Sequence, residues 1–64
     1  MPVVTVEWLE GRTTQQKARL AAAVTQAFGE IANVPKDQVW MVFRDVKRSD
    51  WAIAGKLLEE KSLN

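Results

Sequence analysis

Pro2 is the residue whose type and place in this 64-residue sequence offer the least common chemistry. It directly follows Met1, and a small second residue such as proline generally permits an aminopeptidase to remove the initiator methionine. Removal would turn the Pro2 nitrogen from a non-basic tertiary amide into a secondary amine. An α-amino group has a pKa of about 7.7 to 8.0 and is therefore mainly protonated at pH 7. To act as a neutral base, the amine needs an apolar wall or a nearby cation that lowers its pKa. Pro2 is therefore a candidate base for moving a proton next to a carbonyl group, or simply a proline tolerated at the start of an edge strand.

Five further side chains could complete a site around such an amine. Arg12 could lower the amine pKa, although a lone arginine is also typical of a solvated helix entry. Trp40, Trp51 and Phe43 could form an apolar wall, although the two tryptophans are also typical of core or interface aromatics. Arg44 could assist an anionic ligand, or belong with Lys47 and Arg48 to a solvated turn.

Several classes of function are excluded by what the sequence lacks. Without any His or Cys there is no histidine base, no cysteine nucleophile, no disulfide and no Cys/His metal site. No glycine-rich phosphate loop or metal-spaced carboxylate cluster occurs in the sequence either. A net charge of +1 without a dense basic patch argues against nucleic-acid binding. The apolar runs are too short for a membrane span and no signal-like segment is present, so we expect a cytoplasmic protein.

The elements that must position these residues are predicted from periodicity. Residues 3–9 alternate as a strand, and Thr13 with Gln16 has the pattern of a capping box at the start of an amphipathic helix over 14–32. Leu20, Val24, Ala27, Phe28 and Ile31 form its apolar stripe. After a turn at 33–37, residues 39–43 predict a second strand that ends before Arg44 and Asp45, and a polar loop follows at 47–50. The remainder predicts a short strand or hairpin at 51–55 and a polar tail over 56–64, in which Leu57 and Leu58 dock.

This order of elements predicts an α+β domain over 1–64, a β-α-β unit with two parallel strands. The second strand places Trp40 and Val42 on one face and Val39, Met41 and Phe43 on the other. Both faces are apolar, yet one helix covers only one of them. Since a domain of this size also needs reinforcement, we expect another subunit to cover the second face.

Three stretches taken together resemble the 4-oxalocrotonate tautomerase family: Pro2 before a β-branched strand, Leu-Glu-Gly-Arg-Thr at 9–13, and Trp-Ala-Ile-Ala-Gly at 51–55. The similarity spans nearly the whole chain. It implies a homohexamer, a trimer of dimers, with active sites at subunit boundaries and neither cofactor nor metal. By the same resemblance Pro2 transfers a proton within a conjugated enol or 2-keto acid, Arg12 binds a carboxylate of a small substrate, and Trp51 maintains an apolar pocket.

One departure from the family pattern lies at Trp40, where the better-known tautomerases have a second arginine from a neighbouring subunit. Arg44 lies on the same strand face, about 13 Å along the strand, and could act only from another subunit. An aromatic at Trp40 with an arginine at Arg44 also resembles the α-type subunit of trans-3-chloroacrylic acid dehalogenases. The additional arginine and the water-activating glutamate of those enzymes fall at Leu9 and Ile53 here, so tautomerase is the preferred prediction. A non-catalytic oligomeric binding protein, or a partner subunit of a heterohexamer, is the remaining alternative.

Overall fold

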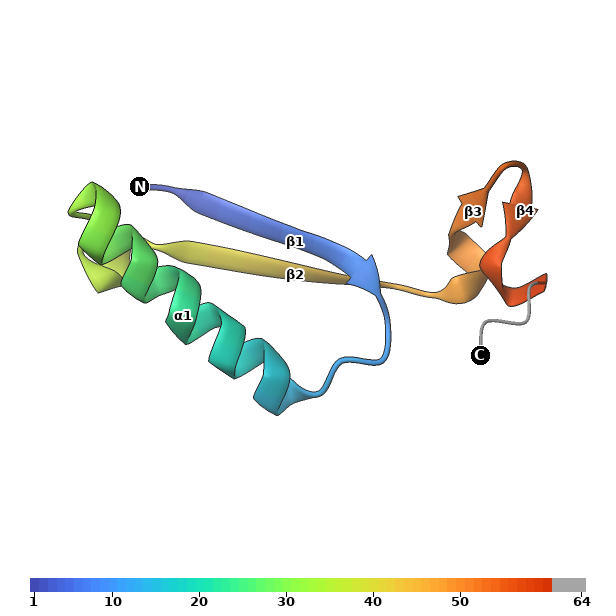
Figure 1. Ribbon diagram of the computed structural model, residues 1–64, viewed down its shortest axis with the longest axis horizontal. Helices are drawn as coiled ribbons and strands as arrows, with labels where there is room; N and C mark the ends of the chain where they lie inside the picture. Colours follow the sequence, from blue (N-terminus) through green and yellow to red (C-terminus); the bar gives the residue numbers. More distant parts are fainter. Residues whose placement is uncertain (61–64) are drawn as a thin grey trace.

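The computed structural model describes residues 1–60 of the chain. It confirms the predicted β-α-β order, followed by a small hairpin, as Figure 1 shows. Short 3-10 turns connect or follow these elements. The elements are β1 (Val3–Leu9), α1 (Thr14–Ala32), β2 (Trp40–Val46), β3 (Ala52–Ile53) and β4 (Lys56–Leu57), with the 3-10 turns at Lys36–Gln38, Arg48–Asp50 and Leu58–Glu60.

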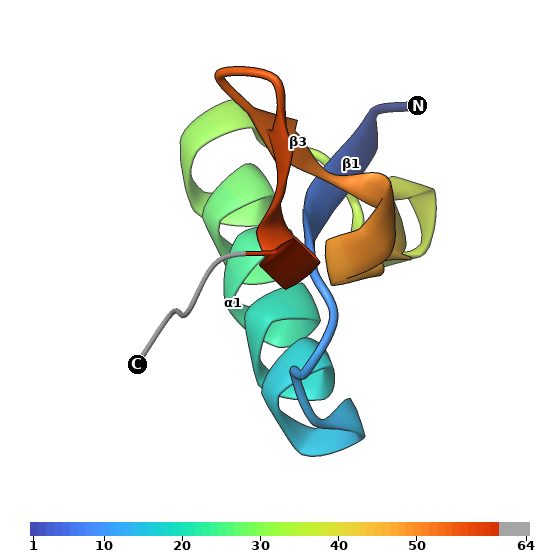
Figure 2. The same ribbon diagram turned by 90° about the vertical axis from the view of Figure 1, so that its right-hand side faces the viewer.

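The sheet consists of β1 and β2, which pair in parallel from Val3 opposite Trp40 to Leu9 opposite Val46. The helix α1 lies along one side of the two strands (Figures 1 and 2). From Val3 to Trp8 and from Trp40 to Arg44, alternate residues, including Val6 and Phe43, are half-buried, and the residues between them are exposed. One face of the sheet is therefore packed and the other, which we call the open face, is uncovered. Its exposed residues are Val3, Thr5, Glu7, Trp40, Val42 and Arg44.

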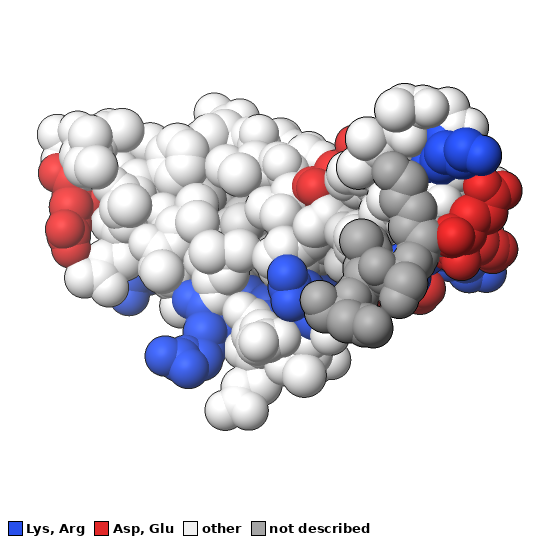
Figure 3. Space-filling view, turned by 45° about the vertical axis from the view of Figure 1, so that its right-hand side comes forward, with Lys and Arg blue, Asp and Glu red and all other residues white. Residues whose placement is uncertain are grey.

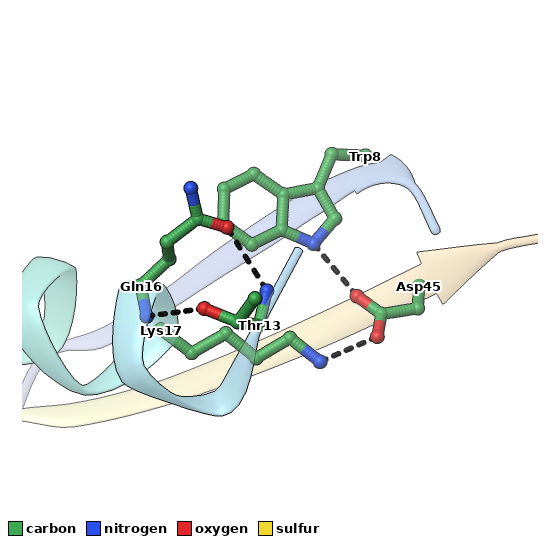
Figure 4. Close-up of polar contacts among 5 residues, drawn as sticks. All are labelled: Trp8, Thr13, Gln16, Lys17 and Asp45. Carbon is green, nitrogen blue, oxygen red and sulfur yellow. Dashed lines mark hydrogen bonds and ion pairs between the residues drawn. The ribbon is translucent and has the colours of Figure 1, made fainter. Parts of the chain in front are cut away.

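The second strand is longer than predicted, since the charged residues expected to end it lie within it. Asp45 is directly opposite Trp8, and its carboxylate accepts a hydrogen bond of 2.7 Å from the Trp8 indole N–H. Its other oxygen forms an ion pair with Lys17 of α1 (Figure 4). A charged residue can stay in a helix-facing strand position when its oxygens are satisfied in this way, so β2 continues to Val46.

The predicted helix bounds are confirmed, and the caps explain them. Thr13 Oγ1 accepts a hydrogen bond from the Gln16 backbone N–H, and the Gln16 side chain accepts one from the Thr13 backbone N–H, at 3.0 and 2.9 Å. This reciprocal pair is the expected capping box. At the other end Asn33 adopts a left-handed conformation with φ of 56°, which closes the helix.

The predicted apolar stripe of α1 is wrong in its last turn. Leu20, Val24 and Phe28 are half-buried, but Ala27 is exposed and Ile31 is 84% exposed. The 19 residues of α1 span about 28 Å, whereas each seven-residue strand spans about 20 Å. The helix is therefore longer than the strands it lies along, and Ile31 in its final turn is left largely exposed.

A C-terminal hairpin is present beyond the end of β2 (Figure 1), but it extends from Ala52 to Leu57. The prediction of a tail from residue 56 is therefore wrong at Lys56 and Leu57, which form the second strand of the hairpin. Ala54 and Gly55 form its two-residue turn with φ of 54° and 81°, as expected for a tight hairpin. Leu58 docks as predicted and is 3% exposed, the one buried hydrophobic side chain among residues 1–60. The prediction of a solvated Arg48 is wrong, since its half-buried guanidinium donates to the Leu58 carbonyl at 2.9 Å. Residues 61–64 of the predicted tail lie outside the described part.

The isolated subunit is too extended for a compact protein of its size. Its radius of gyration is 15.3 Å, against about 10.7 Å expected for 64 residues. Its accessible surface is 5119 Å², against about 4100 Å² expected for a compact 7.2 kDa monomer. Both comparisons favour an assembly that covers the open face. In the part of the chain that the structure describes, no helix has the length and apolar character that crossing a bilayer requires.

The Asp45 interactions predict a pH-dependent contribution to stability. The hydrogen bonds from Lys17 and then from Trp8 hold the Asp45 pKa below its ordinary value of 3.8. A carboxylate with a lowered folded-state pKa stabilises the fold above its unfolded pKa and loses that contribution as pH falls through the folded one. We expect Asp45→Asn, which keeps an acceptor for Trp8 but loses the ion pair, to unfold at lower urea concentration than wild type at pH 7. The urea midpoints of wild type and Asp45→Asn, measured at equal protein concentration, should converge below pH 3.8. A difference between the two midpoints that stays constant down to pH 2.5 would contradict this role of Asp45.

Candidate active site

Pro2 lies immediately before β1, half-buried at the edge of the sheet. Its carbonyl oxygen accepts a hydrogen bond of 3.1 Å from the Trp40 backbone N–H, the first link between the two strands. Met1 is 76% exposed. Removal of Met1 would therefore cost little packing and would leave the Pro2 nitrogen at the start of β1, where Trp40 begins the neighbouring strand.

Arg12 lies at the opposite end of β1, in the loop that leads into α1. Gly11 makes the bend before it, with φ of 122°, a conformation that L side chains rarely adopt. The exposed Arg12 guanidinium lies over the indole of Trp8, 5.7 Å from its ring centroid. Because β1 alone spans about 20 Å, Arg12 cannot reach Pro2 of the same subunit.

Trp40 and Arg44 both lie on the open face, as their spacing predicted. Trp40 is 54% exposed and is opposite Val3, so it lies at the same end of the sheet as Pro2. Arg44 is opposite Glu7, toward the Arg12 end. The structure thus places Trp40 next to Pro2, and Arg44 lies away from both Pro2 and Trp40.

Trp51 follows β2 and begins the hairpin, half-buried beside an open depression of about 290 Å³. Its carbonyl oxygen accepts a hydrogen bond of 2.8 Å from the Leu58 N–H, which ties it to the buried part of the hairpin. The depression is lined by Glu7, Val46, Asp50, Trp51 and Ala52. Like Arg12, Trp51 lies at the end of the molecule opposite Pro2 (Figure 1).

The site residues therefore form two groups in one subunit: Pro2 with Trp40 at one end, and Arg12, Arg44 and Trp51 toward the other. Two residues beside the second group, Trp8 and Asp45, were not predicted from the sequence: Trp8 contacts Arg12, and Asp45 accepts a hydrogen bond from Trp8. They could be found only once the parallel register was known, because it is the register that places them opposite each other. Among residues 1–60, no three or more His, Cys, Asp or Glu side chains gather as a metal site.

The face shown in Figure 3 gives no sign of a polyelectrolyte partner. On the face shown in Figure 3, side chains that are neither acidic nor basic cover the broad central area. Lysine and arginine side chains lie in small separate groups on this face, and acidic side chains lie toward its two ends. This face therefore has no continuous basic patch of the kind that nucleic-acid binding requires.

Comparison with known proteins identifies the family. Residues 2–61 match the model of a family described as tautomerase enzyme. A solved structure of a 4-oxalocrotonate tautomerase homologue, TTHB242, superposes with a TM-score of 0.90 and 31% identity, over 97% of this chain and 98% of that one. The chain belongs to the 4-oxalocrotonate tautomerase family.

Similar tautomerases cover nearly the full length of this one. A probable tautomerase of Ralstonia nicotianae is 39% identical over 61 residues, which are 95% of this chain and 94% of that protein. The 2-hydroxymuconate tautomerase of Bacillus subtilis is 37% identical over 60 residues, with 94% and 97% covered. A solved heterohexameric 4-oxalocrotonate tautomerase of Chloroflexus aurantiacus has a TM-score of 0.80 and 33% identity, with 94% and 97% covered. These relatives support an isomerase that self-associates, while the roles of Pro2, Arg12, Trp40, Arg44 and Trp51 remain predictions.

Proposed function

We propose that this tautomerase moves a proton within a conjugated enol or 2-keto acid, with Pro2 as the general base after removal of Met1. The neutral amine takes the proton of the 2-hydroxyl group of the enol and delivers a proton to a carbon of the conjugated system. The double bonds shift in compensation, so no atom is gained or lost and no cofactor is needed. The observation that carries the proposal is that Pro2, which directly follows Met1 in the sequence, is half-buried, whereas Met1 is exposed.

The site is completed by other copies of the chain. Arg12 and Trp51 lie at the end of the subunit opposite Pro2, so a site that combines all three takes them from a neighbouring subunit. The open face and the projecting hairpin provide surfaces on which neighbours can pack. A cation near the amine and an apolar wall around it both disfavour the ammonium form. Because the neighbouring subunit supplies Arg12 and Trp51, assembly also lowers the pKa of Pro2 in this proposal. We propose a hexamer of identical subunits, built as a trimer of dimers.

Trp40 shapes the choice of substrate. It lies beside Pro2, at the position where the better-known family members carry a second arginine. An exposed indole offers an apolar surface in place of a cation that would bind a second carboxylate. We therefore propose a substrate with one carboxylate, bound by Arg12, and an apolar or aromatic body against Trp40 and Trp51, such as a phenylenolpyruvate-like enol. Arg44 also lies on the open face and contributes, in this proposal, only from another subunit.

The experiment that tests this function combines intact mass measurement with a ketonisation assay on the same sample. Protein whose mass lacks Met1 should ketonise phenylenolpyruvate faster than a dicarboxylate 2-hydroxydienoate. Protein that retains Met1 should be inactive on both, because the Pro2 nitrogen is then an amide. Absence of activity in fully processed protein would instead favour a non-catalytic binding role. The dehalogenase-like alternative gains no support, because Leu9 and Ile53 carry no ionisable group.

A further inference from the structure

We propose that Trp8 is a positioning residue for Arg12: its indole face fixes the guanidinium group that binds the substrate carboxylate. The role of Arg12 in this inference rests on the proposed function, whereas the contact between Arg12 and Trp8 does not depend on it. The guanidinium carbon lies 5.7 Å from the Trp8 ring centroid, within the range of about 6 Å in which a cation is attracted to an aromatic face.

Arg12 needs such a contact because of where it lies in the chain. It is exposed and follows Gly11, in a loop between β1 and the N-cap of α1. The backbone there is confined by the end of β1 and by the capping box, but a long arginine side chain at an exposed loop position has many rotamers. The Trp8 ring face selects among them.

Trp8 can act in this way because its own orientation is fixed from two further directions. Its ring stacks on Phe43, with centroids 5.6 Å apart and planes inclined by 28°. Its indole N–H donates to Asp45 Oδ1 at 2.7 Å, and the other oxygen of that carboxylate pairs with Lys17 (Figure 4). An offset stack and a charge-assisted hydrogen bond together leave the ring little freedom. Residues of β2 and of the Arg12 loop thus contact this indole directly, and α1 is joined to it through Asp45.

The consequence for catalysis is a preorganised carboxylate clamp. An arginine already held in place loses less conformational freedom when it binds its anion, and its planar fork is presented in one direction. Because a remote carboxylate is bound similarly in ground state and transition state, loss of this order should raise KM more than it lowers kcat.

The test is a double-mutant cycle on mass-verified, processed protein with phenylenolpyruvate as substrate. Trp8→Leu removes the ring face and should raise KM about two- to fivefold, equivalent to about 0.5 to 1 kcal/mol at 1.4 kcal/mol per tenfold, with kcat within about twofold of wild type. Trp8→Phe keeps an aromatic face and should restore part of the loss. In an Arg12→Ala background, Trp8→Leu should leave KM unchanged, since the residue it positions is gone. Additive effects on KM would overturn the proposal.

A turnover-independent measurement separates this proposal from the proposed function. In ligand-free protein, NMR relaxation of the Arg12 Nε–H should report an ordered side chain in wild type and a mobile one in Trp8→Leu. Phe28→Leu is the control, because it removes a half-buried aromatic that lies about 21 Å along α1 from the helix start next to Arg12; it should leave Arg12 ordered and KM unchanged. Equal Arg12 mobility in wild type and Trp8→Leu overturns the positioning role. An ordered, Trp8-dependent Arg12 in a protein without turnover supports positioning and contradicts only the proposed activity.

Discussion

Pro2→Ala is expected to lower kcat/KM for ketonisation by about 10²- to 10⁴-fold, the usual contribution of a positioned general base. Alanine also permits removal of Met1, so the two proteins have matched N-termini. What changes is the amine: the ring of Pro2 supplies a nitrogen with two carbon substituents, whereas the substitution leaves a rotating primary amine. A primary amine turns freely about its N–Cα bond, so its lone pair is no longer held in one direction by the ring. The variant should therefore present its neutral amine in the required geometry less often.

The measurement is the initial rate of enol decay, followed from about pH 5 to 9, on protein whose processing has been checked by mass. In wild type, kcat/KM should rise with pH through the pKa of the free enzyme's amine and then level off. The far-UV spectrum of the variant and the number of subunits found by native mass spectrometry should equal those of wild type, since Pro2 contributes no N–H to the sheet. Equal rates in processed wild type and Pro2→Ala would falsify Pro2 as the base.

Local chemistry made the positions of the elements predictable from sequence. Alternation fixed β1 at Val3–Leu9, and the reciprocal Thr13–Gln16 cap fixed the start of α1. The errors arose where the local pattern depends on a distant partner. Asp45 was expected to end a strand because its partners Trp8 and Lys17 become neighbours only through the parallel register. Arg48 was expected to be solvated because the carbonyl of Leu58, which it contacts, lies ten residues further on.

The candidate site was predictable to the same limited extent. Residue types pointed to Pro2, Arg12 and Trp51, and the strand spacing placed Trp40 and Arg44 on one face. The separation of these residues into two distant groups could not be inferred from their types. It follows from the length of β1, which holds Pro2 and Arg12 about 20 Å apart. The candidate site residues of one subunit are therefore divided between its two ends, and in the proposed function they combine only through assembly.

Val42→Asp should abolish both assembly and activity, and it tests that dependence directly. Val42 lies at the centre of the open face, between Trp40 and Arg44 on β2, and is 42% exposed in the isolated subunit. If the subunit worked alone, a charge at so exposed a position would change stability by about 0.5 kcal/mol or less. If a second copy covers this face, the same carboxylate loses its hydration on association, at a cost of several kcal/mol in each interface.

The expected result is a shift from a hexamer-sized particle to smaller species in analytical ultracentrifugation, with ketonisation lost in parallel because Arg12 no longer reaches Pro2 of a neighbour. The thermal midpoint of wild type should rise with protein concentration, as linkage to association requires, and that of the variant should depend on concentration much less. Gln15→Asp is the matched control: it adds the same charge in the exposed first turn of α1, where an acidic group is favourable, and should keep size and activity. A Val42→Asp protein with the size and rate of wild type would show that the open face is not where the subunits meet. Contacts of the projecting hairpin, instead of the open face, would then have to bring Pro2 of one subunit to Arg12 of another.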